Sequence, residues 1–210
     1  MSRKKGFIQK IITLCLVLCM VVSGTVVSAA TSKDVTKSME DRKSVTKLVN
    51  NLSDYIGYQL LYTKTEYKNK KITLDSKFMF EIAGMCMSEP TEKKIHKITK
   101  DVFGKTPDLK ELTLFKSEEK FNASKKMAGR LKDGTILTKL GDWGTAAPTF
   151  KVTKILQNSK TKFQVKVDIL FIDYEDGTSK FLGTAKMNVK KNADSKYGYV
   201  ITSLTVNRAK

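Results

Sequence analysis

The clearest pattern in the chain is an alternation of apolar and polar residues in its C-terminal third. Between residues 162 and 172 every second residue is apolar, from Phe163 to Phe171. A period of two is typical of a β-strand with one buried face. This segment is therefore predicted to be a strand, and similar patterns predict strands over 149–156, 180–190 and 197–207. Together they predict a four-stranded antiparallel meander.

Turn residues separate these predicted strands. Gly177 follows Asp176, and an Asp-Gly pair is typical of a hairpin turn because glycine readily adopts a positive φ angle. Phe181 and every second residue after it, as far as Val189, are predicted to share one face of the next strand. A short fifth strand is predicted over 136–140.

The N-terminal half has the spacing of amphipathic helices instead. Apolar residues recur every three or four positions from Val45 to Leu60, which predicts one long helix with a buried face. A second helix is predicted after Asp75, whose side chain is a good N-cap, and a third ends before Gly104. Between 108 and 132 the pattern weakens, and only a short helical turn is predicted there.

The chain begins with a pattern typical of a secretory signal peptide. Basic residues come first, an almost wholly apolar stretch of about 12 residues follows, and small residues lead up to Ala30. We therefore predict a signal peptide over 1–30 that is cleaved after Ala29 or Ala30. The alternative is an uncleaved anchor, because 11–30 is about 20 residues and long enough to span a bilayer.

The remaining chain is predicted to contain a linker and one domain. Residues 31–44 are rich in Ser, Thr and Lys, so they are predicted to be a flexible polar tether, and 45–210 to be a single domain. Cys86 is the one cysteine outside the predicted signal peptide. The processed chain is therefore expected to have no intramolecular disulfide.

The predicted helices are followed by a meander that contains the Asp176-Gly177 hairpin. In this order of elements the chain resembles the secreted NTF2-like domains of Gram-positive bacteria, which have a cystatin-like fold. The resemblance covers roughly 45–208. It implies an α+β fold in which N-terminal helices pack on a curved antiparallel meander of four to five strands. It also implies a cone-shaped pocket between the helices and the sheet. No functional residue carries over, because the resemblance includes no shared motif.

Candidate catalytic chemistry is limited to one pair of residues. His96 is the only histidine, which excludes sites built from several histidines and leaves Cys86 and His96 as the one candidate pair for nucleophilic catalysis. Cys86 lies between two methionines in an apolar stretch, so it is expected to be a core residue. His96 is flanked by lysines, so a solvated helix face is expected there. We therefore predict no catalytic residue and no cofactor.

Acidic residues gather near the predicted hairpin, and a hard cation needs several oxygens that converge on one point. These residues are Asp168, Asp173, Glu175 and Asp176. Their spacing matches no cation-binding loop. A solvated turn is therefore the preferred interpretation, and no metal site is predicted.

Three aromatic residues are predicted to bind a ligand. Trp143 lies between glycines in a predicted loop, where an aromatic ring can meet a carbohydrate or a lipid. Tyr197 and Tyr199, at the start of the last predicted strand, complete the set. The alternative for Trp143 is a ring folded back over the edge of the sheet.

The charge of the chain indicates what kind of partner it meets. The 210 residues contain 39 Lys and Arg against 21 Asp and Glu, and without the predicted signal peptide the net charge is +14. That remainder has 32 Lys but only three Arg. Specific nucleic-acid recognition favours the planar arginine side chain, so it is not expected here. Lysine suits diffuse attraction to an anionic polymer or lipid surface, although it also simply keeps proteins soluble.

These observations predict an exported, basic binding or scaffold domain. It is expected outside the cytoplasm, at the cell surface, where charge holds it to an anionic cell-wall polymer or a lipid surface and the pocket takes a small ligand. Two alternatives stay open: a small-molecule enzyme that uses the cone-shaped pocket, and an accessory subunit that forms a homodimer through its open sheet face. Inward carboxylates or tyrosines with perturbed pKa values would favour the enzyme.

Signal-peptide cleavage is directly testable. The secreted protein is expected to begin at Ala30 or Thr31, because the small residues before these positions suit signal peptidase. Intact mass spectrometry of the secreted form measures this. A chain that still begins at Met1 would contradict the prediction.

Overall fold

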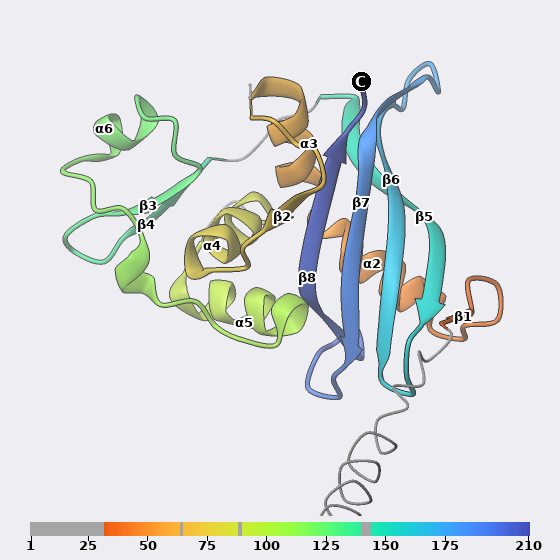
Figure 1. Ribbon diagram of the computed structural model, residues 1–210. Helices are drawn as coiled ribbons and strands as arrows, with labels where there is room; N and C mark the ends of the chain where they lie inside the picture. Colours follow the sequence, from red (N-terminus) through yellow and green to blue (C-terminus); the bar gives the residue numbers. More distant parts are fainter. Residues whose placement is uncertain (1–31, 64, 88–89, 140–143) are drawn as a thin grey trace, which may run out of the picture. The chain divides into compact units, whose positions relative to one another are not determined.

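The computed structural model describes residues 32–63, 65–87, 90–139 and 144–210 (Figure 1). Residues Ser32–Lys210 form one compact unit. The predicted signal peptide and Trp143 lie outside the described residues. Within the described ranges, no helix is both long enough and apolar enough to cross a membrane.

The predicted meander is confirmed. Its strands pair as antiparallel neighbours in chain order. They are β5 (Ala146–Gln157), β6 (Lys162–Asp173), β7 (Ser179–Lys191) and β8 (Tyr199–Arg208). The α+β class is confirmed as well, since helices precede this sheet.

Two short strands extend the sheet to six strands in the order β1-β5-β6-β7-β8-β2. β2 (Lys70–Ile72) pairs with β8, and β1 (Lys33–Asp34) pairs with β5. β1 lies in the stretch predicted to be a flexible tether, and Val35 next to it is buried in the core. The pattern does not reveal this because the contact is made by the backbone: the Val35 amide donates to the Ile155 carbonyl at 2.9 Å.

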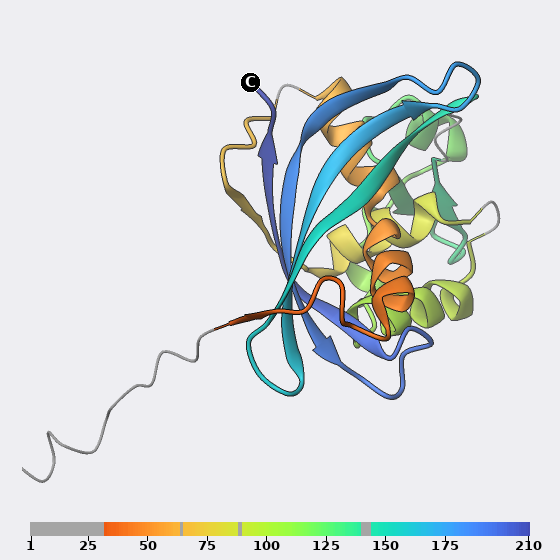
Figure 2. The same cartoon turned by 90° about the vertical axis from the view of Figure 1, so that its right-hand side faces the viewer.

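Four helices cover one face of the meander. They are α2 (Arg42–Asn50), α3 (Ser53–Tyr62), α4 (Ser76–Met85) and α5 (Glu92–Phe103). Figure 2 shows these helices on one side of the sheet, with the strands bending toward them and no helix on the other side. We call the uncovered side the outer face.

The single long first helix predicted from Val45 to Leu60 is wrong, since α2 and α3 are separate helices. Asn51 ends α2: its side-chain amide donates to the carbonyls of Lys47 at 2.9 Å and Leu48 at 3.0 Å. A side chain that occupies the last carbonyls of a helix competes with its continuation. The apolar spacing continues across the break, which is why the pattern hides it.

The other helix ends agree with the sequence. The Asp75 side chain accepts a hydrogen bond from the Phe78 amide at 2.8 Å and so caps α4. Gly104 ends α5 with a φ of 71°, in the left-handed region that glycine enters without strain.

The region of weak pattern forms a small lobe of its own. It contains the 3₁₀ helix η1 (Leu109–Glu111), α6 (Glu118–Asn122), β3 (Ala128–Arg130) and β4 (Ile136–Thr138). A strand does form within 136–140, but the prediction that it joins the meander is wrong. β4 pairs with β3 in a separate two-stranded sheet. α4 is buried on all sides from Phe78 to Met85 and contacts both parts. Phe78 and Ile82 join the main core, and Phe80 joins the second core, in the lobe.

The space between helices and meander is filled by apolar side chains. Phe150, Met187 and Ile201 from the sheet are at most 1% exposed, and Leu48 and Ile56 from the helices are fully buried among them. Where the resemblance implied a cone-shaped pocket, the interior holds packed side chains.

A β-bulge in β7 changes which residues face the core. Ile169 pairs with Gly183 but Leu170 pairs with Phe181, so Leu182 is an extra residue in the ladder. Leu182 is buried and Phe181 is 50% exposed, which reverses the prediction for Phe181. A shift of one residue moves every following side chain to the opposite face.

Asn50 ties α2 to the exposed edge of β5, so its loss is expected to destabilise the fold. Its amide group donates to the Phe150 carbonyl at 3.2 Å and accepts from the Phe150 amide at 2.9 Å, as a neighbouring strand would. Asn50→Leu leaves both backbone groups unpaired and is expected to lower the free energy of unfolding by about 2 kcal/mol. Urea denaturation measures this. Lys43→Leu, on the exposed side of α2, is the control and is expected to stay within about 0.5 kcal/mol of the wild type.

Candidate functional site

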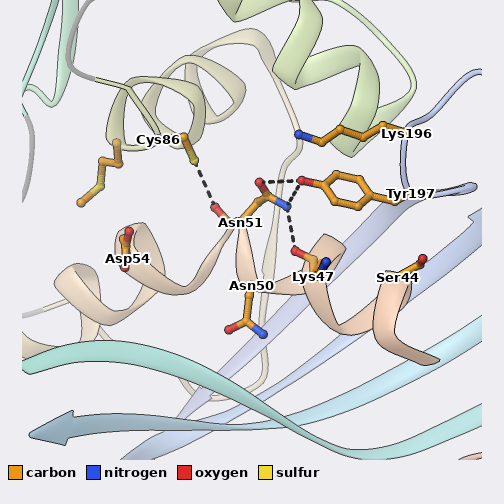
Figure 3. Close-up of a pocket in the computed structure, with 9 residues that line it drawn as sticks. Ser44, Lys47, Asn50, Asn51, Asp54, Cys86, Lys196 and Tyr197 are labelled. Atoms are coloured by element: carbon orange, nitrogen blue, oxygen red, sulfur yellow. Dashed lines mark hydrogen bonds between the residues drawn. The ribbon is translucent and has the colours of Figure 1, made fainter. Parts of the chain in front are cut away.

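One open cleft lies where α2 and α3 meet the end of α4 and the loop before β8 (Figure 3). Its volume is about 810 Å³, and polar side chains form much of its wall. They include Lys47, Asn51, Asp54, Lys196 and Tyr197. The break between α2 and α3 shapes this cleft, because Asn51 stands at that break.

Of the two predicted ligand-binding residues that the structure describes, Tyr197 lines this cleft. Its hydroxyl accepts a hydrogen bond from the Asn51 amide at 3.0 Å, and the Lys196 ammonium lies 4.9 Å from the centre of its ring. The hydroxyl therefore holds the end of α2, while the ring forms a wall of the cleft.

Cys86 stands at the end of α4 and also lines the cleft. The prediction that it is a core residue is wrong, because the residue is exposed. Its Sγ donates to the Asn51 carbonyl at 3.8 Å. Although the residue as a whole is exposed, neighbouring groups displace water around its thiol, which raises the thiol pKa to about 11, and the nearby negative charge of Asp54 adds to this. The thiol is therefore protonated at neutral pH and is a weak nucleophile.

His96 does not line the cleft that contains Cys86. It is half-buried on α5, and its Nε2 lies 3.9 Å from the carboxylate of Glu92 on the same helix. The structure therefore places the candidate catalytic pair in different surroundings.

Tyr199 lies in the core at 3% exposure. Its ring packs edge-on against Phe163, with 5.7 Å between ring centres, and its hydroxyl donates to Asp41 at 2.8 Å. Burial raises the pKa of its phenol, and the Asp41 hydrogen bond and charge add to this. Tyr199 thus anchors the loop before α2, and it does not line the cleft with Tyr197.

The acidic hairpin forms an ordered turn. Asp173 accepts from the Glu175 amide at 2.9 Å, and Asp176 accepts from the Thr178 amide at 2.7 Å. Hydrogen bonds from Thr178 hold the pKa of Asp176 below its usual value. Nowhere in the described ranges do three or more His, Cys, Asp or Glu side chains converge on a point that could hold a metal ion.

Two buried carboxyl groups were not predicted from the sequence: Asp101 of α5 and Glu81, which lies next to a tyrosine. Glu81 on α4 is 8% exposed, and the Tyr55 hydroxyl donates to its Oε2. Burial raises the pKa of Tyr55, and the charge of Glu81 raises it further, so this phenol remains a donor. The available signal was a single acidic residue in an otherwise apolar helix, where an unpaired charge is costly.

The outer face of the sheet carries a row of lysines that crosses it from β5 to β2. Lys154 pairs with Lys166, Lys166 with Lys186, Lys186 with Thr205, and Thr205 with Lys71. We call these four lysines the lysine row. Neighbouring strands lie about 4.8 Å apart, so four steps between strands give the row a length of about 19 Å.

Most of the lysine row has uncompensated charge. Lys154 forms an ion pair with Asp34 at 3.5 Å. No carboxylate in the described part of the chain forms an ion pair with Lys71, Lys166 or Lys186. A cleft of about 480 Å³ is lined by Lys166 and Lys186 of the row, and Asp168 is the acidic residue that lines it.

Comparison with models of known protein families, with curated proteins and with solved structures gave no match.

The raised pKa of Cys86 predicts slow alkylation. At pH 8 a thiol with a pKa of about 11 is roughly 0.1% ionised, against about a quarter for an ordinary cysteine. In a chain with Cys15→Ser and Cys19→Ser, iodoacetamide is expected to react about a hundredfold more slowly than with free cysteine. The rate should still rise between pH 8 and pH 10, and Asp54→Asn should raise it. Mass spectrometry follows the reaction, and a rate that levels off near pH 9 would contradict the prediction.

Proposed function

We propose that this protein is an exported, non-enzymatic binding domain of the NTF2-like type that holds an anionic cell-wall polymer on the outer face of its sheet. The observation that carries the proposal is the lysine row. Four lysines occupy neighbouring register positions across the sheet, and three of them have no ion-pair partner among the described residues.

The shape of this charge suits an extended polymer. A line of cations about 19 Å long fits a chain with repeated negative groups better than a single small anion. Lysine attracts such groups as a mobile point charge and needs no fixed geometry from the ligand. Binding of this kind is expected to be tolerant of sequence or composition and sensitive to salt.

The leader supports the location. A basic and then apolar N-terminus is typical of export, and outside a Gram-positive cell the abundant anionic polymers are wall polymers that carry phosphate. The strongly basic composition of the whole chain agrees with such a partner.

The lysine row also argues against the homodimer alternative. An isologous dimer through the outer face would bring two like-charged rows together, and such contacts are unfavourable. The enzyme alternative rests on Tyr55 and Glu81, whose hydrogen bond and burial resemble acid–base machinery. That pair lies on the helices, away from the lysine row.

Removal of the lysine row charge tests the proposal. In Lys71→Gln/Lys166→Gln/Lys186→Gln, the affinity for purified wall teichoic acid is expected to fall about tenfold or more, because each exposed ion pair contributes up to about 1 kcal/mol. The dependence of the affinity on salt should weaken as well. Binding is measured by calorimetry between 20 and 200 mM NaCl.

The matched control is Lys93→Gln/Lys100→Gln/Lys110→Gln, which removes the same charge from exposed positions of α5 and η1. It is expected to retain nearly the affinity of the wild type. Equal losses in both variants would mean that only net charge matters, and the proposed site would be wrong. If the protein binds anionic lipid vesicles but not the polymer, the partner is a membrane and the proposed polymer is wrong.

A further inference from the structure

A second groove lies on the helical side of the protein, between α3 and the loop that precedes β3. Its volume is about 860 Å³, which is within the range of small-molecule and oligomer sites. Residues of three kinds line it: tyrosines of α3, the buried Glu81 of α4, and lysines from α4 and the 124–127 loop. None of these residues belongs to the lysine row.

Tyrosine rings form one wall of the groove. Tyr58 and Tyr62 are one helical turn apart on α3, their ring centres are 5.3 Å apart, and the rings are tilted by 45°. Tyr62 is 65% exposed, which is unusual for a ring of this size. Two neighbouring rings present an apolar surface to a flat, partly apolar ligand.

Glu81 and Tyr55 lie deep in the groove. Glu81 is 92% buried by its neighbours, yet it lines the groove, and Tyr55 is its one hydrogen-bond partner among the described residues. That bond uses Oε2, so Oε1 remains able to accept a hydrogen bond. Oε1 is not one of the fully buried unpartnered atoms among the described residues, so a donor on a ligand in the groove can reach it.

The opposite wall is cationic and held in place. Lys77, Lys125 and Lys126 line the groove, and no ion pair engages them in the described residues. Lys139 differs, because its ammonium donates to the carbonyls of Asn122, at 2.9 Å, and Ser124. Lys139 therefore fixes the loop and shapes the groove, while the other lysines remain available to a ligand.

We propose that this groove binds an acidic saccharide, and this goes beyond the polymer site on the outer face. A sugar ring lies on Tyr58 and Tyr62, a sugar hydroxyl donates to Glu81 Oε1, and the acid group of a neighbouring sugar meets the lysines. A purely apolar ligand would leave Glu81 and the lysines unpaired. An oligonucleotide has a charge on every unit and would bring a phosphate close to Glu81, so it fits less well.

Calorimetry with defined oligosaccharides tests the proposal on the secreted protein. The probes are a hyaluronan hexasaccharide, in which uronic acid alternates with an amino sugar, and the neutral chitohexaose. The acidic hexasaccharide is expected to bind at least about fivefold more tightly than the neutral one, which corresponds to about 1 kcal/mol from the lysines.

Two variants locate the binding. Tyr62→Leu removes an exposed ring and is expected to weaken binding about fivefold, and Lys125→Gln/Lys126→Gln is expected to abolish the preference for the acidic probe. Circular dichroism checks that each variant is folded. The control Lys93→Gln/Lys100→Gln, at exposed positions of α5, is expected to leave hexasaccharide binding unchanged.

Three results would overturn the proposal. These are no binding of either hexasaccharide, equal binding of both, or tighter binding of the single-stranded hexanucleotide dT6 than of the hyaluronan probe. A fourth result, loss of hexasaccharide binding in Lys166→Gln/Lys186→Gln but not in the groove variants, would assign the saccharide to the lysine row instead. The proposed function is tested with a different polymer and different variants, so the two proposals fail separately.

Discussion

The structure depends on the burial of one apolar sheet face beneath α2 to α5. Phe150, Met187 and Ile201 are at most 1% exposed. Burial of each such side chain contributes about 1.5–3 kcal/mol to the stability of the fold. The helices cover only one face of the meander. The other face must therefore be polar, and this requirement leaves the outer face free to carry lysines.

The lysine row follows from that constraint together with the strand register. A period of two directs Lys166 and Lys186 outward because Val165, Val167 and Met187 point inward. Pairing then sets the lysines of neighbouring strands opposite one another. Like charges placed opposite each other destabilise a sheet, so the row costs stability that the buried face offsets. An anionic partner bound to the row would offset this repulsion.

α4 has a related role on the helical side. Because apolar side chains leave it on more than one side, it contributes to the main core and to the core of the small lobe at once. The lobe is thereby held beside α3, and the groove between them contains the one charged residue of α4 that is buried, Glu81. Cys86 at the end of the same helix has a raised thiol pKa and no histidine in its cleft, which is the opposite of an activated nucleophile.

The local sequence was enough to predict features that depend on contacts within a few residues. The alternation from Phe163 onward defines a strand and its buried face, and Asp75 and Gly104 define helix ends, because periodicity and capping act within a few residues. The partner of β4, the exposure of Phe181 and the alignment of the lysine row were decided by tertiary structure alone. Each of these depends on register between segments far apart in the chain, and a shift of one residue leaves the local pattern intact while it reverses what faces the solvent.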